Sequence, residues 1–460
     1  MLQVKAAPGL VLLTVGIATF LSSLNSSIVN TVLPVIKSSL HLSLTESAWV
    51  VLMYLLVLSV LLLPVGRLSD LWGRRRIFLI GFILFAAACV LSGMSGNLWE
   101  LLTGRAVLAI GGAMLLSVGP ALITTTFAPE KRGFALGMQA LMTYLGLTVG
   151  PLAGGALTEL WGWQSVFYSS IPLAVVGFVL ALVVVSPQSH SQGKANLDSA
   201  STLLYVVAMV SVVFLFNSQI IESYQTLAIV LAGFAFVVTT WLFVRKQKRI
   251  QVPLIDVSLF QVRNFGFGTA GAIFNYLCLF LALFLLPMYM ADILHLSPAK
   301  VGLWLTIMPL FMMISAPITG ALSDKMGSRL FSTAGMLAGT LGLGCFAILQ
   351  NDARAIGFWM TSGLVLTGLG TGLFAAPNNA AIMRAAPFNK QGMASGTLAT
   401  ARYVGMMAGI TVGSALFTTI ERHISAANST AAFSNAFTWV MWVGAAFGLV
   451  GMLCASLMKR

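Results

Sequence analysis

Long apolar runs separated by short polar segments fill the chain from one end to the other. Fourteen of these runs approach the length of about 20 residues that a helix needs to cross a bilayer. They lie near residues 9–35, 47–65, 77–95, 98–126, 133–158, 164–186, 199–217, 225–245, 264–290, 297–321, 329–349, 355–383, 391–421 and 434–457. The longest polar stretches, around 186–198 and 245–263, have the length of linkers. The pattern predicts an all-α membrane protein with one polytopic domain.

Composition agrees with this pattern and gives no sign of a metal or cofactor site. The chain is 58% hydrophobic and 8% charged, with a mean hydropathy of +0.95. The four cysteines stand singly in apolar runs and the four histidines fall in predicted loops, so neither type has metal-ligand spacing. The N-terminus enters the first run without a small-residue cleavage site, which predicts a retained first helix. We expect no cofactor and no metal.

The net charge of +13 has the distribution of a topology signal. With the N-terminus inside, nineteen of the 25 Lys and Arg residues fall in cytoplasmic segments. The opposite side holds four, namely Lys37, Lys300, Arg354 and Arg422. Such a bias orients membrane proteins by the positive-inside rule. We therefore expect both termini in the cytoplasm and no nucleic-acid partner.

Two segments that follow apolar runs are near copies. Residues 66–76 read GRLSDLWGRRR and residues 320–330 read GALSDKMGSRL. We predict both as charged loops, eight spans apart and on the same face. Two six-helix halves would place them only six spans apart, so two extra helices, at 199–217 and 225–245, must lie between the halves. The predicted division is 1–190 and 251–460 as six-helix bundles, with 191–250 as a linker carrying the inserted pair.

The ordered motifs resemble those of the major facilitator superfamily, in its fourteen-span drug/proton antiporter branch. GRLSDLWGRRR is similar to the family's loop between helices 2 and 3, and GLTVGPLAGG (146–155) is similar to the antiporter motif of helix 5. LNSSIVNTVLP (24–34) resembles the first-helix motif, and VPLIDVSLF (252–260) the segment before helix 9. The resemblance covers nearly the whole chain and implies the major facilitator fold.

The first motif is interpreted as a gating loop. Its glycines permit a tight turn, and its Asp carboxylate is suited to dock on a helix N-terminus or an arginine. The resemblance implies a latch that holds the halves together on the cytoplasmic side, and a plain topology-setting basic cluster is the alternative. The candidate residues are Gly66, Asp70, Gly73, Arg74 and Arg75, with Asp324 in the second copy.

The antiporter motif comprises Gly146, Gly150, Pro151, Gly154 and Gly155. Glycines at this spacing let a helix pack closely against a neighbour, and the proline removes one backbone hydrogen bond. The resemblance implies a role in antiport, in a helix that rocks during alternating access. Ordinary close packing needs the same residues and is the alternative.

Arg105 lies inside the fourth span, where a charge costs at least about 2.5–3.5 kcal/mol unless it faces a partner or a wet cavity. The resemblance ties an arginine here to proton transfer. The family's Gln and Gly neighbours are replaced by Leu108 and Ala109. Arg402 is a second buried arginine and a candidate counterpart in the other half. Snorkelling from a helix end is the alternative for both.

The chain departs most from the family at Asn25, where the family commonly has Asp. All twelve acidic residues fall in predicted loops or at helix ends. A cavity with Arg105 and no acid suits neutral, zwitterionic or anionic amphiphiles better than cations. Proton coupling then requires an edge acid such as Glu46, Asp70 or Asp292, or the partners of Arg105. The alternative for Asn25 is a simple hydrogen bond between helices.

Further polar side chains within spans are candidates for a substrate cavity, because a buried amide without a partner is costly. They are Asn25, Asn30, Tyr54, Gln139, Tyr144, Asn275, Asn378 and Arg402.

The function predicted from these features is secondary active export, by alternating access, of hydrophobic or amphiphilic compounds across the inner membrane of a bacterium. It is multidrug efflux of the proton-coupled type. No P-loop for ATP and no catalytic constellation occurs, so we predict that the protein is not an enzyme. A lipid, siderophore or metabolite exporter and a non-transporting scaffold or sensor remain as alternatives. A monomer and a complex with a periplasmic adaptor are both open.

Overall fold

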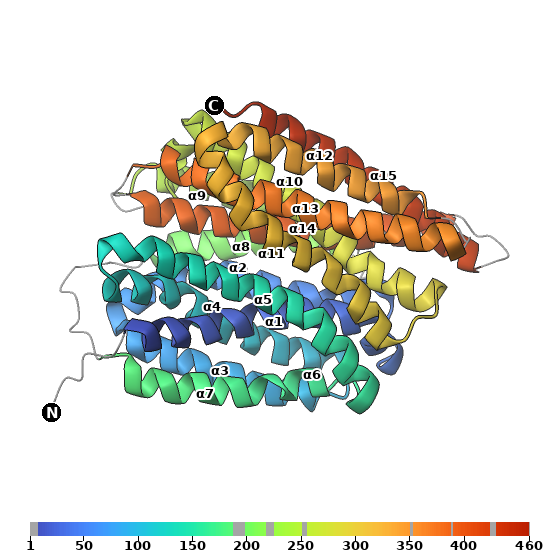
Figure 1. The fold of residues 1–460 in the computed structure, drawn as a ribbon, viewed down its shortest axis with the longest axis horizontal. Helices are drawn as coiled ribbons and strands as arrows, with labels where there is room; N and C mark the ends of the chain where they lie inside the picture. Colours follow the sequence, from blue (N-terminus) through green and yellow to red (C-terminus); the bar gives the residue numbers. More distant parts are fainter. Residues whose placement is uncertain are drawn as a thin grey trace. The chain divides into compact units, whose positions relative to one another are not determined.

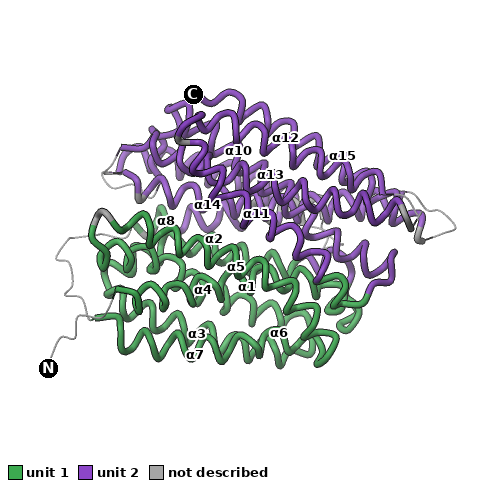
Figure 2. Tube along the Cα trace, viewed as in Figure 1, with its two compact units in different colours: residues 1–42, 49–202, 297–302 green, residues 43–48, 203–296, 303–460 purple. Residues whose placement is uncertain are grey.

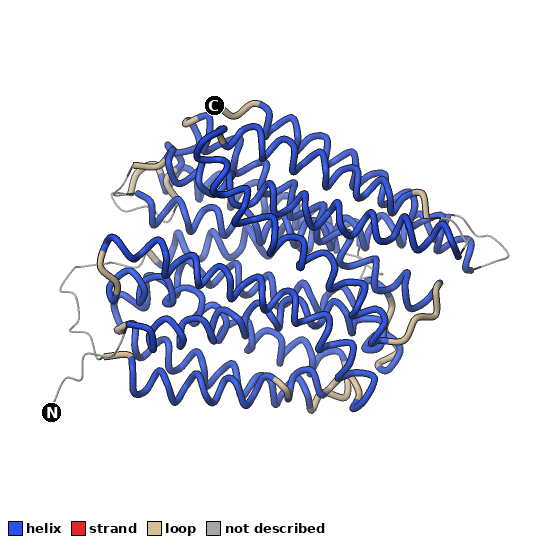
Figure 3. The backbone as a smooth tube through the Cα atoms, in the orientation of Figure 1, coloured by secondary structure: helices blue, strands red, loops and turns tan. Residues whose placement is uncertain are grey.

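The structure, a computed structural model, describes residues 8–186, 198–217, 225–250, 255–349, 353–387, 390–423 and 429–459. These residues form helices joined by short connections (Figures 1 and 3). The helices are α1 Pro8–Ser39, α2 Leu44–Trp72, α3 Arg74–Gly93, α4 Leu98–Thr126, α5 Pro129–Trp161, α6 Ser165–Tyr168, α7 Ser170–Val184, α8 Ser199–Asn217, α9 Gln225–Gln247, η3 Val257–Gln261, α10 Arg263–Met288, η4 Tyr289–Ile293, α11 Pro298–Met326, α12 Ser328–Ala347, α13 Ala353–Ala385, α14 Gln391–His423 and α15 Ser429–Ser456.

The predicted all-α membrane fold is confirmed. Among the described residues, thirteen helices are long and apolar enough to cross a membrane, and Ala200–Ser211 within α8 is a shorter apolar helix. The short α6 and the following α7 share the single predicted run at 164–186. The fifteen α-helices therefore overlap the fourteen predicted spans.

The chain forms two compact units (Figure 2). Unit 1 comprises residues 1–42, 49–202 and 297–302, and unit 2 comprises residues 43–48, 203–296 and 303–460. In unit 1, α1 packs on α5 and α4, and α3 packs on α4 and α7. In unit 2, α12 packs on α13 and α15, and α10 packs on α14 and α15. The separate linker domain predicted at 191–250 remains a prediction.

Each unit contains a glycine stripe that brings two helices together. In α5, a Cβ at Gly146 would lie 2.6 Å from the Phe20 carbonyl oxygen of α1. In α14, a Cβ at Gly409 would collide with the Leu277 carbonyl oxygen of α10. Glycines recur at every fourth position in both helices, at 146, 150 and 154 and at 405, 409 and 413. Such stripes let membrane helices approach to backbone contact.

The prediction of charged loops at 66–76 and 320–330 is wrong. Residues 66–72 complete α2 and residues 320–326 complete α11. The serine hydroxyls in these last turns bond within their own helix: Ser69 Oγ donates to the Gly66 carbonyl at 2.7 Å, and Ser323 Oγ donates to the Gly320 carbonyl at 2.8 Å. A single glycine separates each helix from the next: Gly73 lies between α2 and α3, and Gly327 lies between α11 and α12.

The two connecting glycines explain where each helix pair turns. Gly73 has φ +92° and Gly327 has φ +88°. This backbone conformation costs a residue with a Cβ about 1–3 kcal/mol. The histidine prediction also needs a correction, because His423 is the last residue of α14 and does not lie in a loop.

Candidate functional site

The centre of unit 1 holds a buried arginine whose recorded partners are backbone carbonyls and an aromatic ring. Arg105 of α4 is fully buried. Its Nε donates to the Val50 carbonyl oxygen at 3.0 Å, and its Nη1 donates to the Asn25 carbonyl oxygen at 3.4 Å. Its guanidinium carbon lies 4.6 Å from the centre of the Tyr54 ring. Helices α1, α2 and α4 thus meet at this one side chain.

Two neighbouring polar residues fix the geometry around the guanidinium. Tyr54 donates its hydroxyl to the Ser22 carbonyl oxygen at 3.2 Å. Asn25 donates from Nδ2 to Ser170 Oγ of α7 at 3.0 Å and to the Leu21 carbonyl at 3.2 Å. The predicted interhelical bond of Asn25 is therefore present. The sequence indicated the burial of Arg105 and Asn25 but not their partners, which are carbonyls of α1 and α2 for Arg105 and the Ser170 hydroxyl of α7 for Asn25.

The cluster leaves one donor and one acceptor without a partner in the described structure. Arg105 Nη2 and Asn25 Oδ1 are both buried and make no hydrogen bond there. Unpaired buried polar atoms are uncommon in folded proteins and mark strain, function or an added ligand or water. Among the described residues no carboxylate is bonded to Arg105. The site therefore combines a positive charge with spare hydrogen-bonding capacity.

Three further predicted cavity residues of unit 1 lie outside this cluster. Gln139 Nε2 donates to Thr19 Oγ1 at 3.2 Å, which joins α5 to α1. Asn30 Nδ2 donates to the Ser26 carbonyl within α1 at 3.4 Å, and its Oδ1 is buried without a partner in the described structure. Tyr144 is partly buried on α5, where its carbonyl accepts from Thr148.

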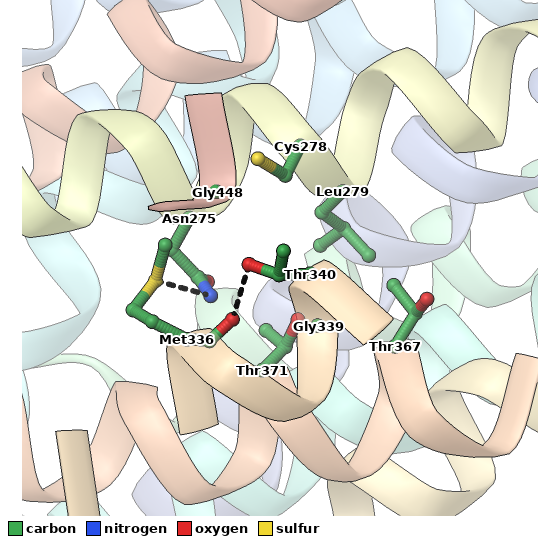
Figure 4. A pocket seen from close by; sticks show the side chains of 9 residues that line it. All are labelled: Asn275, Cys278, Leu279, Met336, Gly339, Thr340, Thr367, Thr371 and Gly448. Atoms are coloured by element: carbon green, nitrogen blue, oxygen red, sulfur yellow. Dashed lines mark hydrogen bonds between the residues drawn. The ribbon is translucent and has the colours of Figure 1, made fainter. Parts of the chain in front are cut away.

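Unit 2 has a small cavity lined by Asn275 and three threonines, Thr340, Thr367 and Thr371, together with apolar groups (Figure 4). Asn275 of α10 donates from Nδ2 to the Met336 sulfur at 3.5 Å, and Thr340 Oγ1 donates to the Met336 carbonyl at 2.8 Å. Asn275 Oδ1 and Thr367 Oγ1 are buried and make no hydrogen bond to any described residue. The cavity measures about 10 Å³, enough for one water molecule.

The arginine site of unit 1 has no equivalent at the matching position of unit 2. Gly81 of α3 packs on Gly111 of α4, and Gly335 of α12 packs on Gly370 of α13. Arg105 precedes Gly111 by six positions, and six positions before Gly370 stands the buried Leu364. The counterpart position thus carries a leucine.

The predicted counterpart, Arg402, lies on a different helix. It belongs to α14, where its guanidinium carbon is 5.8 Å from the centre of the Tyr276 ring. Asn378 of α13 donates from Nδ2 to the Gly268 carbonyl at 3.0 Å, which joins α13 to α10. Asn378 thus serves helix contact, and Arg402 remains a separate candidate.

The acidic residue of the first repeated segment bonds within its own segment. Asp70 Oδ1 lies 3.1 Å from Arg74 Nη2, and the Asp70 side chain is 43% exposed. Arg74 Nη1 also donates to the Ala121 carbonyl at 3.3 Å, and Arg75 Nη2 donates to the Leu182 carbonyl at 2.7 Å. These bonds tie α2 and α3 to the ends of α4 and α7. The Asp324 side chain lies outside the described residues, and the gating role stays a prediction.

The segment that resembles the family motif before helix 9 makes an ion pair in unit 2. Asp256 Oδ2 lies 2.6 Å from Lys390 Nζ, beside the start of α14. Hydrogen bonds from Lys390 and from Ser258 lower the pKa of Asp256 below its ordinary value. Residues 252–254 of this motif lie outside the described residues.

The antiporter-type motif has a second contact face besides α1. A Cβ at Gly155 would collide with the Pro298 carbonyl oxygen, and one at Gly302 would collide with the Pro151 carbonyl oxygen. Residues 297–302, the start of α11, belong to unit 1 with α5. Helix α5 is therefore in backbone contact with α1 on one side and with the first turns of α11 on another.

The acids at helix ends that are coupling candidates are not part of the Arg105 cluster. Glu46 caps its own helix, α2, and Asp292 lies exposed in the π-helical turn η4. The sequence reasoning missed Glu159, whose carboxylate accepts a hydrogen bond from the Ala299 N–H at 3.0 Å.

An apolar groove of about 400 Å³ lies between α1, α5 and α7 in unit 1. Its lining includes Leu12, Phe20, Met138 and Met142. In a membrane-spanning unit such a groove suits hydrocarbon chains.

Comparison with known proteins identifies the family. The model of the Major Facilitator Superfamily matches residues 15–268 and 268–460. The riboflavin transporter RibZ of Clostridioides difficile is 29% identical, over 98% of this chain and 97% of that protein. The multidrug resistance protein Stp of Mycobacterium tuberculosis is 28% identical, over 91% and 78%. The tetracenomycin C resistance and export protein of Streptomyces glaucescens is 27% identical, over 89% and 76%.

Solved structures agree on the fold. A crystal structure of the peptide transporter POT in complex with sulfate superposes with a TM-score of 0.70, at 16% identity, over 98% of this chain and 96% of that one. The chain belongs to the Major Facilitator Superfamily of membrane transporters, and it is not an enzyme.

Proposed function

We propose that this transporter is a secondary active exporter of hydrophobic or amphiphilic compounds that works by alternating access and is driven by protons. Similarity to proteins named for multidrug resistance and for tetracenomycin C export supports the export direction. The distribution of basic residues supports a place in the cytoplasmic membrane with both termini inside. The gating and antiporter motifs would supply the moving parts.

The Arg105 cluster carries the proposal on substrate charge. A buried guanidinium with an unpaired Nη2 and no bonded carboxylate among the described residues favours groups that accept hydrogen bonds or carry negative charge. A cationic substrate placed near it would meet a like charge in a medium of low dielectric. Neutral, zwitterionic and anionic amphiphiles are therefore the proposed substrates.

Proton coupling in this proposal runs through acids at helix ends. Asn25 stands where the resembling family has Asp, and an amide does not titrate. Asp70, Glu46 and Asp292 are the remaining acids that the sequence singled out, each partly or largely exposed.

Flux in proteoliposomes with an imposed pH gradient tests the proposal. We expect the wild type to move an anionic or neutral dye and not a quaternary ammonium dye. Arg105→Ala should lower this flux about tenfold or more, because it removes charged hydrogen bonds, whereas Arg105→Lys should retain part of it. Efficient gradient-driven export of the quaternary ammonium dye by wild type would contradict the proposal.

Asn25→Asp separates coupling from binding in the same assay. If the gradient drives flux only in Asn25→Asp, coupling has been lost at this position in the natural sequence. If it drives flux equally in wild type, another acid carries the proton.

Export of a polar metabolite is the second candidate, and similarity to a protein named as a riboflavin transporter favours it. Riboflavin flux in the same vesicles, with the amphiphile as competitor, distinguishes the two. A non-transporting scaffold would show neither flux nor stabilisation by any of these compounds.

A further inference from the structure

Helix α11 begins with a carboxylate that belongs to another helix. Glu159, near the end of α5, accepts a hydrogen bond from the Ala299 N–H at 3.0 Å. The Ser297 side chain also hydrogen bonds to this carboxylate, and Lys300 adds an attractive charge. The first N–H groups of a helix have no partner within it, and the helix dipole favours a negative charge there. Glu159 therefore caps α11 across 140 positions of sequence.

Two other helices, α2 and α4, take this carboxylate from their own first turn. At α2, Ser43 and Glu46 bond reciprocally: the Ser43 N–H donates to Glu46 Oε2 at 2.8 Å, and the Glu46 N–H donates to Ser43 Oγ at 3.2 Å. At α4, the Gly96 N–H donates to Glu100 Oε2 at 2.8 Å. The first turn of α11 contains no acidic residue.

The glycine contacts show that the whole first turn is seated on α5. Ideal Cβ positions at Gly155 and Gly302 fall on the backbone of the facing helix in both directions. Residues 297–302 cluster with unit 1, whereas residues 303–326 of the same helix cluster with unit 2. Helix α11 thus starts in one compact unit and continues in the other.

We infer that Glu159 is a latch that holds the first turn of α11 against the antiporter-type face of α5. The carboxylate supplies the attraction, and Gly155 and Gly302 supply the close fit. The inference deepens the proposed function, because in alternating access the release of this turn is a step of the transport cycle. The role of Glu159 as a latch is not indicated by its place near the end of α5 or by the antiporter motif that precedes it in the sequence.

Hydrogen–deuterium exchange of the full chain in lipid nanodiscs tests the latch without a substrate or a gradient. Glu159→Ala removes the acceptor, Glu159→Gln keeps an acceptor without the charge, and Glu100→Gln is the matched control at a helix that caps itself. We expect Glu159→Ala to speed exchange about fivefold or more, the loss typical of a missing cap, in residues 299–302 and in residues 152–156. Glu159→Gln should lie between it and wild type, and Glu100→Gln should leave both segments unchanged.

Faster exchange confined to residues 299–302 would make Glu159 an ordinary helix cap, and unchanged exchange would remove it from the contact. Either result overturns the inference. Failure of the proposed function looks different: wild type would then transport none of the dyes, while the exchange result stands. Where a dye is transported, an unchanged flux in Glu159→Ala would overturn the role of the latch in transport.

Discussion

Helices α2 and α11 are two versions of one element, and they differ in how they begin. Both are 29 residues long, both follow the sequence Leu-His-Leu-Ser, and both end in the repeated Gly-x-Leu-Ser-Asp segment. His41 and His295 precede them with φ values of 53° and 49°. At the fourth position from Ser43 stands Glu46, whereas the fourth position from Ser297 is Lys300.

The difference lies in the source of the capping carboxylate, since the first residues of both helices belong to a different unit from the rest of the helix, 43–48 to unit 2 and 297–302 to unit 1. With Glu46 in place, α2 closes its own N-terminus. Without an acid there, α11 takes its cap from Glu159 and its close contact from Gly302, where α2 has the buried Ala48. The same fold element thus caps its own N-terminus in one copy and takes its cap from Glu159 of α5 in the other.

The largest effect is expected from removing the close contact. Gly302→Ala places a methyl group on the Pro151 carbonyl oxygen, a backbone atom that has little room to move. Overpacking of this kind costs about 1–3 kcal/mol, so the first turn of α11 should leave α5. Exchange in residues 299–302 should rise about tenfold, and flux should fall by a similar factor.

The matched substitution in the other copy is Ala48→Gly, which creates no clash. It should cost only about 0.5–1 kcal/mol through helix propensity and leave flux close to that of wild type. If both substitutions slow transport equally, the start of α11 has no special role and the comparison fails.

The sequence predicted the fold well because apolar length is a local property. The repeated segments and the distance between them predicted two inserted helices between related halves, a division that remains a prediction. The boundaries of the repeated segments were wrong, since Asp70 and Arg74 looked like loop residues. One glycine with positive φ is sufficient to end one helix and begin the next, and the polar side chains before it fit at the end of a helix.

The candidate site could be predicted only in part. A charged residue inside an apolar span is visible in the sequence, so Arg105 could be identified as a candidate from the sequence alone. Its partners are backbone carbonyls of α1 and α2, which carry no sequence signal. Glu159 was missed because its partner lies 140 positions away. The sequence Leu-His-Leu-Ser occurs before both helices, but Glu46 follows the first copy and Lys300 stands at the same place after the second. This difference indicates that α11 lacks an acid to cap its own N-terminus.

A smaller effect, equal in both copies, is expected at the glycines that follow the two helices. Gly73→Ala and Gly327→Ala meet no atom within 4 Å, so only the positive φ opposes the new methyl group. Each should lower stability by about 1–3 kcal/mol, measured as a drop in thermal midpoint in detergent. A drop in only one copy would show that the two turns are not equivalent.

The smallest effect, and the sharpest test of the comparison, is expected from making the two helix starts alike. Lys300→Glu gives α11 the Ser-x-x-Glu capping box of α2. The new carboxylate can then serve the first N–H groups, so α11 should depend less on Glu159. In this background Glu159→Ala should speed exchange in residues 299–302 only about twofold, compared with about fivefold in wild type. Equal effects in both backgrounds would mean that position 300 does not decide how α11 is capped, and the difference between the two helices would have to lie elsewhere in the contact with α5.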